Sequence, residues 1–338
     1  MCQEIVGSFS FTPGFNRVVD ASLLYFSNRF SGFSVTPKTV KNGWLLSVSF
    51  DHPVETGCEW EAITIRPSFF LAHRNLHMSY QDKVVIITGG SHGIGEGCVR
   101  AFVAAGAKVV FCARNDRDGE RLAAEVNASG PGEAQFIRCD VSKVEEIQSL
   151  IDETVERFGR IDCLINNAGW HPPNKPIDEF SIEEFRDLLD LNLVSIFTAC
   201  KFALPHLRRT QGNIINMSSL VGAMGQLHAT TYVATKGAIT AFTKALAIDE
   251  AEHGIRVNSI SPGNIFTPLW QQAIDAAPNP DQTLAEGEAA QLLGRMGTIE
   301  EVGKLCLFIA SEATFTTGVD HVISGGAELG YGRKSRRG

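Results

Sequence analysis

The sequence has no apolar run approaching the roughly 18 residues that a helix needs to cross a bilayer. Its N-terminal segment also lacks the basic start, apolar centre and small-residue cleavage site of a secretory signal. No two cysteines form a Cys-x-x-Cys pair, and no histidines cluster with the spacing of metal ligands. These absences indicate a cytoplasmic protein with no membrane partner and no metal site.

Positive charge is in deficit, with 30 Lys and Arg residues against 38 Asp and Glu residues and a net charge of −8. That balance argues against nucleic acid as a partner. The one basic run lies near the C-terminus, and we expect residues 333–338 to be a solvated tail. Several of the eight cysteines lie in apolar, strand-like runs such as 109–112, which indicates buried free thiols in a reducing compartment.

Residues 1–77 show none of the regular pattern that follows them. They are rich in Phe and Ser, and their apolar run at 44–50 is not followed by the partner elements that a small core requires. We therefore expect 1–77 to be a poorly ordered or non-native N-terminal extension, with Met78 as the true start. A small α+β module is the alternative.

From Met78 to about residue 332, short apolar runs alternate with segments of helical spacing. Strands alternating with helices predict a single domain with a doubly wound (Rossmann) parallel sheet of seven strands and helices on both faces. The expected strands are 83–87, 108–112, 134–138, 161–165, 212–217, 256–260 and 319–323. The expected helices are 96–105, 120–128, 144–158, 182–207, 231–252 and 302–310. The stretch 264–293 is expected to be irregular, as a lid or a disordered loop.

A glycine-rich turn, Thr88-Gly-Gly-Ser-His-Gly-Ile-Gly95, joins the first strand of this domain to its first helix. In that context the backbone N–H groups and the helix N-terminus can bind a pyrophosphate. We expect Gly89 to permit the tight turn, Gly93 to allow close approach, and Gly95 to let the helix pack against the strand. The predicted cofactor-binding residues of this turn are Thr88, Gly89, Ser91, His92, Gly93, Ile94 and Gly95.

The residue that ends the second strand of such a fold meets the adenosine ribose, where an acid binds the 2′-OH of NAD and an Arg can accept the 2′-phosphate of NADP. Here the strand ends in Ala113, and Arg114 follows it. The missing acid and the Arg favour NADP(H). NAD(H) stays possible, because Asp116 is a nearby acid.

The motif Tyr232-x-x-x-Lys236 places two side chains on one face of a predicted helix, thirteen residues beyond Ser219. An ammonium beside a phenol favours the phenolate, so we expect the Tyr232 pKa to fall below its usual ~10. A tyrosine that exchanges a proton near neutral pH is a general acid/base for interconverting alcohols and carbonyls.

Together, these ordered motifs resemble the classical short-chain dehydrogenase/reductase family, over residues 78 to about 332. Further matching motifs are Cys139-Asp-Val141, Asn166-Asn-Ala-Gly169, Asn192 and Pro262-Gly263. The resemblance implies a catalytic set of Asn192, Ser219, Tyr232 and Lys236, with Asn192 holding the lysine through a water. It also implies that the cofactor is bound by Tyr232 and Lys236, and by Asp140, Val141, Asn167, Ala168, Gly169, Pro262, Gly263, Ile265 and Thr267.

Within that family, the stretches 213–222, 261–270 and 325–332 are similar to the type 14 branch of the 17-beta-hydroxysteroid dehydrogenases. Ala113, Trp170 and the short tail after Tyr331 depart from that branch, which leaves the cofactor and the substrate open. A hydroxysteroid substrate is the main interpretation, and a monosaccharide (an aldose such as fucose) or a polyol is the alternative. A non-catalytic cofactor-binding scaffold is a third possibility. The expected substrate-binding residues are Ser219, Gln226, His171, Trp270 and Tyr331, in a homotetramer that places Tyr331 near a neighbour's pocket.

Overall fold

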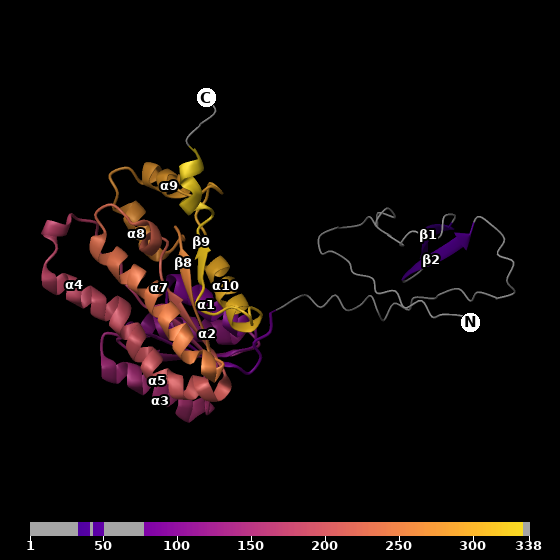
Figure 1. Cartoon of the computed structure of the whole chain (residues 1–338), viewed down its shortest axis with the longest axis horizontal. Helices are drawn as coiled ribbons and strands as arrows, with labels where there is room; N and C mark the ends of the chain where they lie inside the picture. Colours follow the sequence, from indigo (N-terminus) through magenta and orange to yellow (C-terminus); the bar gives the residue numbers. More distant parts are fainter. Residues whose placement is uncertain (1–32, 41–42, 51–77, 334–338) are drawn as a thin grey trace. The chain divides into compact units, whose positions relative to one another are not determined.

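The computed structural model describes residues 33–40, 43–50 and 78–333, and the chain divides into two units, Met1–Leu76 and His77–Gly338 (Figure 1). In the first unit, β1 (Phe33–Val40) and β2 (Gly43–Phe50) form an antiparallel pair in which Phe33 lies opposite Phe50. The apolar run at 44–50 is therefore a strand with a partner, which its sequence did not indicate. The rest of 1–77 and residues 334–338 lie outside the described residues, so the extension and the basic tail stay predictions.

The second unit is built on seven parallel strands in the order β5-β4-β3-β6-β7-β8-β9. The strands are β3 (Val84–Thr88), β4 (Lys108–Ala113), β5 (Glu133–Arg138), β6 (Cys163–Asn166), β7 (Asn213–Met217), β8 (Arg256–Pro262) and β9 (Asp320–Ile323). The chain moves outward from β3 to one edge of the sheet and then from β6 to the other, so the predicted doubly wound sheet is confirmed. The carboxyl ends of β3 and β6 meet where the direction reverses.

Helices cover both faces of this sheet because alternate strand residues point to opposite sides. Val85 and Ile87 of β3 pack with helices on one face, and Ile86 packs with helices on the other. The first face carries α1 (Gly93–Ala104), α2 (Asp116–Ser129) and α10 (Ile299–Ser311). The second carries α3 (Val144–Phe158), α5 (Ser195–Thr210) and α7 (Thr230–Glu250) (Figure 1).

Two glycines bring α1 and α10 into close contact. A Cβ on Gly97 would lie 2.1 Å from the Ile299 carbonyl oxygen, and one on Gly303 would lie 2.2 Å from the Gly97 carbonyl oxygen. No side chain fits at either position without moving a helix. This contact fixes the direction of α1, and with it the glycine-rich turn at its start.

The long helix expected at 182–207 is divided into α4 (Ile182–Leu189), a π-helical turn at Asp190–Val194, and α5. The span Ile182–Thr210 is long enough to cross a membrane and contains an 18-residue window with a mean hydropathy of 1.4, so it passes as a membrane span by length and composition alone. Its inner side is part of the core, through Ile196, Ala203 and Leu207. We therefore interpret the span as a core helix of the domain.

The expectation of an irregular stretch at 264–293 is wrong, because α8 (Pro268–Asp275) and α9 (Pro280–Ala289) occupy most of it. Each helix has Pro in its first turn, and a preceding side chain, Thr267 or Asn279, accepts a hydrogen bond from its backbone. Thr-Pro and Asn-Pro are ordinary helix starts that the weak apolar periodicity concealed. The remaining short helices are Ile177–Glu179, α6 (Val221–Met224), Ala251–His253 and Ala327–Arg333.

Candidate active site

The glycine-rich turn is tied to the end of β6 by Thr88 and Asn167. The Thr88 Oγ1 atom accepts hydrogen bonds from the backbone N–H groups of Asn167 at 3.0 Å and Ala168 at 3.1 Å. The Asn167 side-chain amide donates to the carbonyl oxygens of Thr88 and Gly89, both at 3.0 Å. The two loops at the point where the sheet reverses direction are therefore held together.

The backbone of the turn fits a pyrophosphate. Gly89 and Gly93 adopt φ angles of 66° and 56°, a left-handed region that favours glycine. A Cβ on Gly95 would lie 2.1 Å from the Gly89 carbonyl oxygen, so Gly95 is needed for packing against the turn itself. The N-cap residue His92 makes no side-chain cap to α1, which leaves first-turn N–H groups available for an anion.

His92 is engaged elsewhere. Its Nδ1 lies 2.9 Å from Ser91 Oγ, and its Nε2 lies 3.3 Å from Asp118 Oδ2 of α2. The ring therefore links the glycine-rich turn to α2 on the exposed side of α1. Ile94, also expected at the cofactor, packs against the core beneath the turn.

At the adenosine end, Arg114 is exposed directly after β4, and Asn115 caps α2 through a hydrogen bond from the Asp118 N–H. Partial burial raises the pKa of Asp140, but hydrogen bonds from Ser142 and the charge of Arg114 outweigh it and lower the pKa overall. Arg114 and Asp140 therefore lie near each other, with Val141 buried beside them. This arrangement provides a cationic side chain and a charged carboxylate at the end of the sheet where an adenosine would bind.

Ser219, Tyr232 and Lys236 meet at the carboxyl end of β7. Lys236 is buried, with 4% of its surface exposed, and its ammonium donates to the Met217 carbonyl oxygen at 2.9 Å. That ammonium lies 5.6 Å from the centroid of the Tyr232 ring, and the Tyr232 hydroxyl is hydrogen-bonded to Ser219. Ser218, next in sequence, donates to the Lys236 carbonyl at 2.8 Å and fixes α7 against the strand end.

The expected lowering of the Tyr232 pKa is wrong for the protein alone. Burial raises the pKa of Tyr232 to about 12, although the hydrogen bond with Ser219 partly opposes the change. Burial also lowers the pKa of Lys236 to about 8. The site disfavours both charges because it is largely shielded from water, and the ammonium is directed at a carbonyl oxygen instead of at the phenol.

The surroundings of Lys236 fit the ribose of a nicotinamide cofactor. An ammonium has three N–H donors, and a buried one needs acceptors for them. A Cβ on Gly169 would lie 3.2 Å from Asn192 Oδ1 and 3.5 Å from Lys236 Nζ, so glycine keeps the space before these groups open. When bound, ribose hydroxyls would supply the missing acceptors.

Asn192 is fully buried in the π-helical turn, and all its observed partners are on the protein. Its Oδ1 accepts from the Trp170 N–H at 2.8 Å, and its Nδ2 donates to the Trp170 carbonyl at 2.9 Å and to Thr235 Oγ1 at 3.1 Å. The side chain thus holds the segment after β6 against α7. Its predicted link to Lys236 through a water stays a prediction.

The predicted substrate residues are only partly brought together. His171 lies over Tyr232, with ring centroids 4.1 Å apart, and its Nε2 is 3.2 Å from Gln226 Oε1. Trp270 points elsewhere: its indole packs against Gly287 of α9, 3.1 Å from where a Cβ would stand. Tyr331 lies in the helix Ala327–Arg333, and its side chain is outside the described part of the structure.

The loop after β8 closes the site opposite the glycine-rich turn. Thr267 faces Gly93, since a Cβ there would lie 3.5 Å from Thr267 Cγ2. Pro262 and Ile265 are buried, and Gly263 donates its N–H to the Ile323 carbonyl at 2.9 Å. These positions agree with the prediction that the loop after β8 would lie along a bound nicotinamide.

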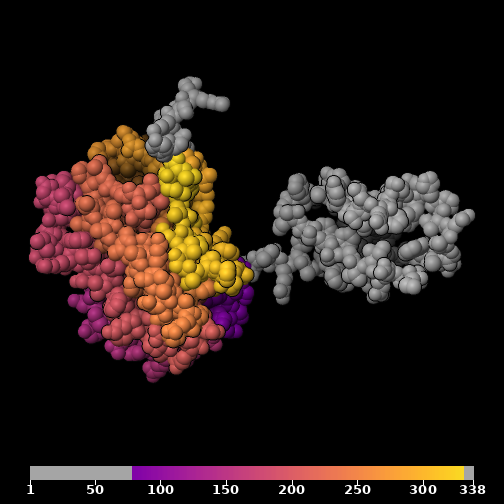
Figure 2. All heavy atoms as spheres, viewed as in Figure 1, coloured from indigo at the N-terminus to yellow at the C-terminus, as the bar shows by residue number. Residues whose placement is uncertain are grey.

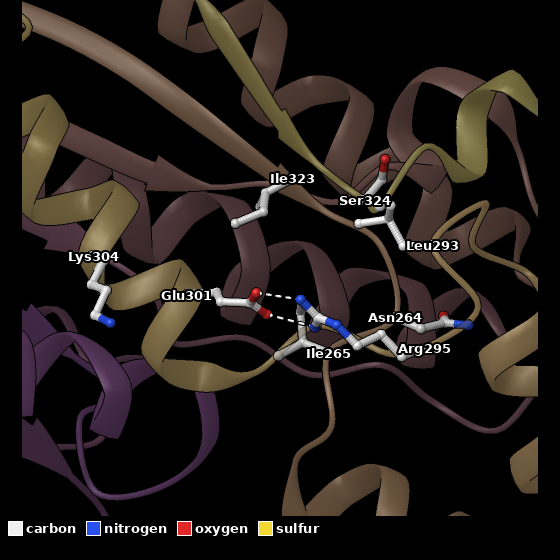
Figure 3. A pocket seen from close by; sticks show the side chains of 10 residues that line it. Asn264, Ile265, Leu293, Arg295, Glu301, Lys304, Ile323 and Ser324 are labelled. Carbon is white, nitrogen blue, oxygen red and sulfur yellow. Dashed lines mark hydrogen bonds and ion pairs between the residues drawn. The ribbon is translucent and has the colours of Figure 1, made fainter. Parts of the chain in front are cut away.

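The loop after β8 also lines a pocket of about 310 Å³. Figure 3 shows Ile265 and Ile323 in its wall, together with the ion pair Arg295–Glu301. The two Arg295–Glu301 hydrogen bonds measure 3.0 and 2.6 Å. Together with the Thr298 N–H, they lower the pKa of Glu301 to about 2. The pair anchors the start of α10 to segment 295–297, whose Gly297 pairs with Ile265.

Sequence reasoning missed a buried row of amides beneath the site. Asn166 donates to Asn216 at 2.8 Å, and Asn216 donates to Thr243 at 2.9 Å, which joins β6, β7 and α7. The amide row had one visible signal in the sequence: each of two neighbouring strands has an Asn near its end, at positions that the register places opposite each other.

The six described cysteines are buried and free, as expected.

Comparison with known proteins places this arrangement among oxidoreductases. A family model described as enoyl-(acyl carrier protein) reductase matches residues 89–328. The L-fucose dehydrogenase of Bos taurus is 55% identical over 256 residues, covering 76% of this chain and 93% of that protein. That of Rattus norvegicus is 56% identical with the same coverage. The meso-2,3-butanediol dehydrogenase of Serratia marcescens is 35% identical, covering 76% of this chain and 98% of that protein.

Among solved structures, the L-sorbose reductase of Gluconobacter frateurii, in complex with NADPH and L-sorbose, superposes with a TM-score of 0.71 at 27% identity. The match covers 74% of this chain and 98% of that one. These relatives favour the sugar or polyol alternative over the hydroxysteroid interpretation. The polar pair His171–Gln226 beside Tyr232 agrees with this, because polar side chains at a substrate site suit a substrate with several hydroxyl groups.

Proposed function

Because this chain belongs to the short-chain dehydrogenase/reductase family, we propose that it is an NAD(P)-dependent oxidoreductase of a monosaccharide such as L-fucose, or of a related polyol. The observation that carries the proposal is the meeting of Ser219, Tyr232 and Lys236 at the end of β7, with Asn192 beside them. The sugar assignment rests on relatives named L-fucose dehydrogenase and on the polar groups around Tyr232.

The bound nicotinamide supplies a hydride acceptor or donor. Ser219 holds the substrate oxygen by a hydrogen bond and orients it toward Tyr232. In oxidation, the Tyr232 oxygen takes the hydroxyl proton while the carbinol carbon loses its hydride; in reduction, the phenol returns a proton to the carbonyl oxygen. The raised pKa of Tyr232 keeps the phenol protonated in the protein alone, a state ready for reduction. Oxidation requires the phenolate, which the Lys236 ammonium can stabilise if it turns from the Met217 carbonyl.

For the sugar, we assign His171 and Gln226 to the recognition of a second hydroxyl. His171 lies over Tyr232 and is bonded to the Pro172 carbonyl oxygen and to Gln226 Oε1, so a substrate hydroxyl would replace one of these partners or pair with the amide N–H groups of Gln226. A substrate with several hydroxyls would pair with them, whereas a substrate with one would not. Trp270 is assigned to packing between α8 and α9.

For the cofactor, we propose a preference for NADP(H), with NAD(H) as the alternative. Arg114 is exposed and near Asp140, and Ala113 provides no carboxylate for a ribose 2′-OH. The sorbose reductase with NADPH is a related case. Asp116, the first residue of α2, is the acid through which NAD could bind instead.

We further propose a homotetramer in the cytoplasm. The outer faces of α5 and α7, adjacent in the view of Figure 2, expose Phe197 and Ile248, with 52% and 77% of their surfaces accessible, and Val194, directly before α5, is 41% accessible. Such apolar area on neighbouring helices is typical of a subunit interface. Mass photometry measures the assembly, and a monomer would contradict this proposal.

Initial rates at the nicotinamide absorbance test the assignment, with L-fucose, meso-2,3-butanediol and oestradiol oxidised by NAD or NADP, and L-sorbose reduced by NADH or NADPH. We expect L-fucose with NADP to have the highest kcat/KM. The variant Tyr232→Phe should lose about 10²- to 10⁴-fold in kcat and still bind cofactor. Full turnover by this variant would refute the mechanism, and a higher kcat/KM for oestradiol would refute the sugar.

A further inference from the structure

A second pocket lies beside the catalytic residues, between segment 170–173 and one face of α4. Its volume is about 380 Å³, within the usual range for small-molecule sites. Most of its wall is apolar and is formed by Trp170, Pro172, Pro173, Phe180, Leu188 and Leu191. Lys175, Glu184 and Asp187 also line it.

This pocket is separate from the site of hydride transfer. Trp170 and Pro172 line it, while His171 between them stacks on Tyr232. Trp170, Pro172 and Pro173 therefore border the pocket, whereas His171 borders the catalytic tyrosine. Ser219, Gln226 and Tyr232 are absent from the pocket wall.

The charges at the pocket favour a cation. Lys175 is already paired, with its ammonium 2.7 Å from Glu184 and 4.5 Å from the centroid of the Phe180 ring. Asp187 is exposed and makes no ion pair with any residue in the described part of the chain. One carboxylate is therefore left uncompensated at the edge of a wall of aromatic and proline rings.

We propose that this pocket binds a small organic ammonium ion with an aromatic or aliphatic body. The body packs on Trp170, Pro172, Leu188 of α4 and Leu191 of the π-helical turn, and the ammonium reaches Asp187. Trp170, which is 47% exposed, provides an aromatic ring for the cation, as Phe180 does for Lys175. An anion of the same shape meets a wall with one net negative charge, from Glu184 and Asp187 against Lys175, and is disfavoured.

Occupation of the pocket acts on catalysis through Trp170. The backbone N–H and carbonyl of Trp170 are both bonded to Asn192, next to the catalytic lysine. A ligand that displaces Trp170 would alter these two hydrogen bonds without entering the substrate site. It should therefore change kcat and leave the substrate KM nearly constant.

Calorimetric titration of the full chain, saturated with NADP, tests the proposal with three ligands of one shape: benzylammonium, benzyl alcohol and phenylacetate. We expect affinity to fall in that order. Asp187→Asn should weaken benzylammonium about fivefold, the loss of one partly exposed ion pair, and leave benzyl alcohol unchanged. Trp170→Leu should weaken benzylammonium by a similar factor.

The matched control is Glu183→Gln, which removes the same charge from the same helix outside the pocket. It should leave the binding of benzylammonium unchanged. Equal affinities for the amine and the alcohol, or equal losses in Asp187→Asn and Glu183→Gln, would overturn the proposal. A loss in Gln226→Ala would place the ligand on the Tyr232 side and overturn it as well. These are binding measurements, so they stand apart from the identity of the sugar substrate.

Discussion

The buried ammonium of Lys236 makes the stability of the protein depend on pH in a way that can be measured without turnover. Burial lowers its pKa from 10.5 to about 8. Between these two pH values the unfolded chain binds a proton that the folded chain does not, so the free energy of unfolding rises with pH. Below pH 8 the folded protein carries the full cost of the buried charge, about 3 kcal/mol for a shift of this size.

The variant Lys236→Met removes this effect and keeps a side chain of similar length. The difference in unfolding free energy, wild type minus variant, should rise by about 3 kcal/mol between pH 7 and pH 11. Tyr232 titrates in both proteins, so its own contribution largely cancels from the difference. Urea unfolding at several pH values, in the absence of cofactor, measures it.

Lys244→Met is the matched control on the same helix, because its side chain is solvated in folded and unfolded chains alike. A difference between wild type and Lys236→Met that stays flat with pH would refute the reasoning. It would show that water or another group compensates the ammonium within the fold.

Three further outcomes are expected. Gly97→Ala should lower the free energy of unfolding by about 1–3 kcal/mol in urea titrations, because the added Cβ would meet the Ile299 carbonyl oxygen. Gly294→Ala is the control: no atom beyond its chain neighbours lies within 4 Å of the added Cβ, so this variant tests backbone strain alone. Arg114→Asp should raise kcat/KM with NAD relative to NADP by at least about tenfold; an unchanged ratio would remove Arg114 from the 2′-phosphate site. Asn192→Leu should lower kcat and expose amides of segment 170–173 to hydrogen exchange, since both backbone bonds of Trp170 are lost; unchanged exchange would contradict the anchoring role.

The sheet and its glycine-rich turn were predictable because their signals are local. Apolar runs as short and as rich in β-branched residues as Val84–Thr88 favour buried strands, and the glycines that follow them mark a turn with a left-handed backbone. The helix of Tyr232 and Lys236 was equally visible, since a spacing of four places both side chains on one face.

The protonation state of the site was not predictable, because it depends on competing environments. Sequence spacing places an ammonium near a phenol, but it says nothing of the Met217 carbonyl that the ammonium binds, nor of the burial that raises the Tyr232 pKa. The helices α8 and α9 were missed for a different reason. Their caps, Thr267 and Asn279, are clear, but the apolar periodicity after them is weak.

The five-residue turn at Asp190–Val194 has a consequence for how deletions will be tolerated. Inward-facing residues recur every four positions at Leu188, Asn192 and Ile196, more slowly than the 3.6 residues of a regular turn. The π-helical turn accommodates the extra residue, because it holds more residues per turn than the α-helix does. Losing one residue there would let the backbone return to a regular helix in which Leu188 and Ile196, then seven residues apart, still point within about 20° of each other, so the change would fall on Asn192.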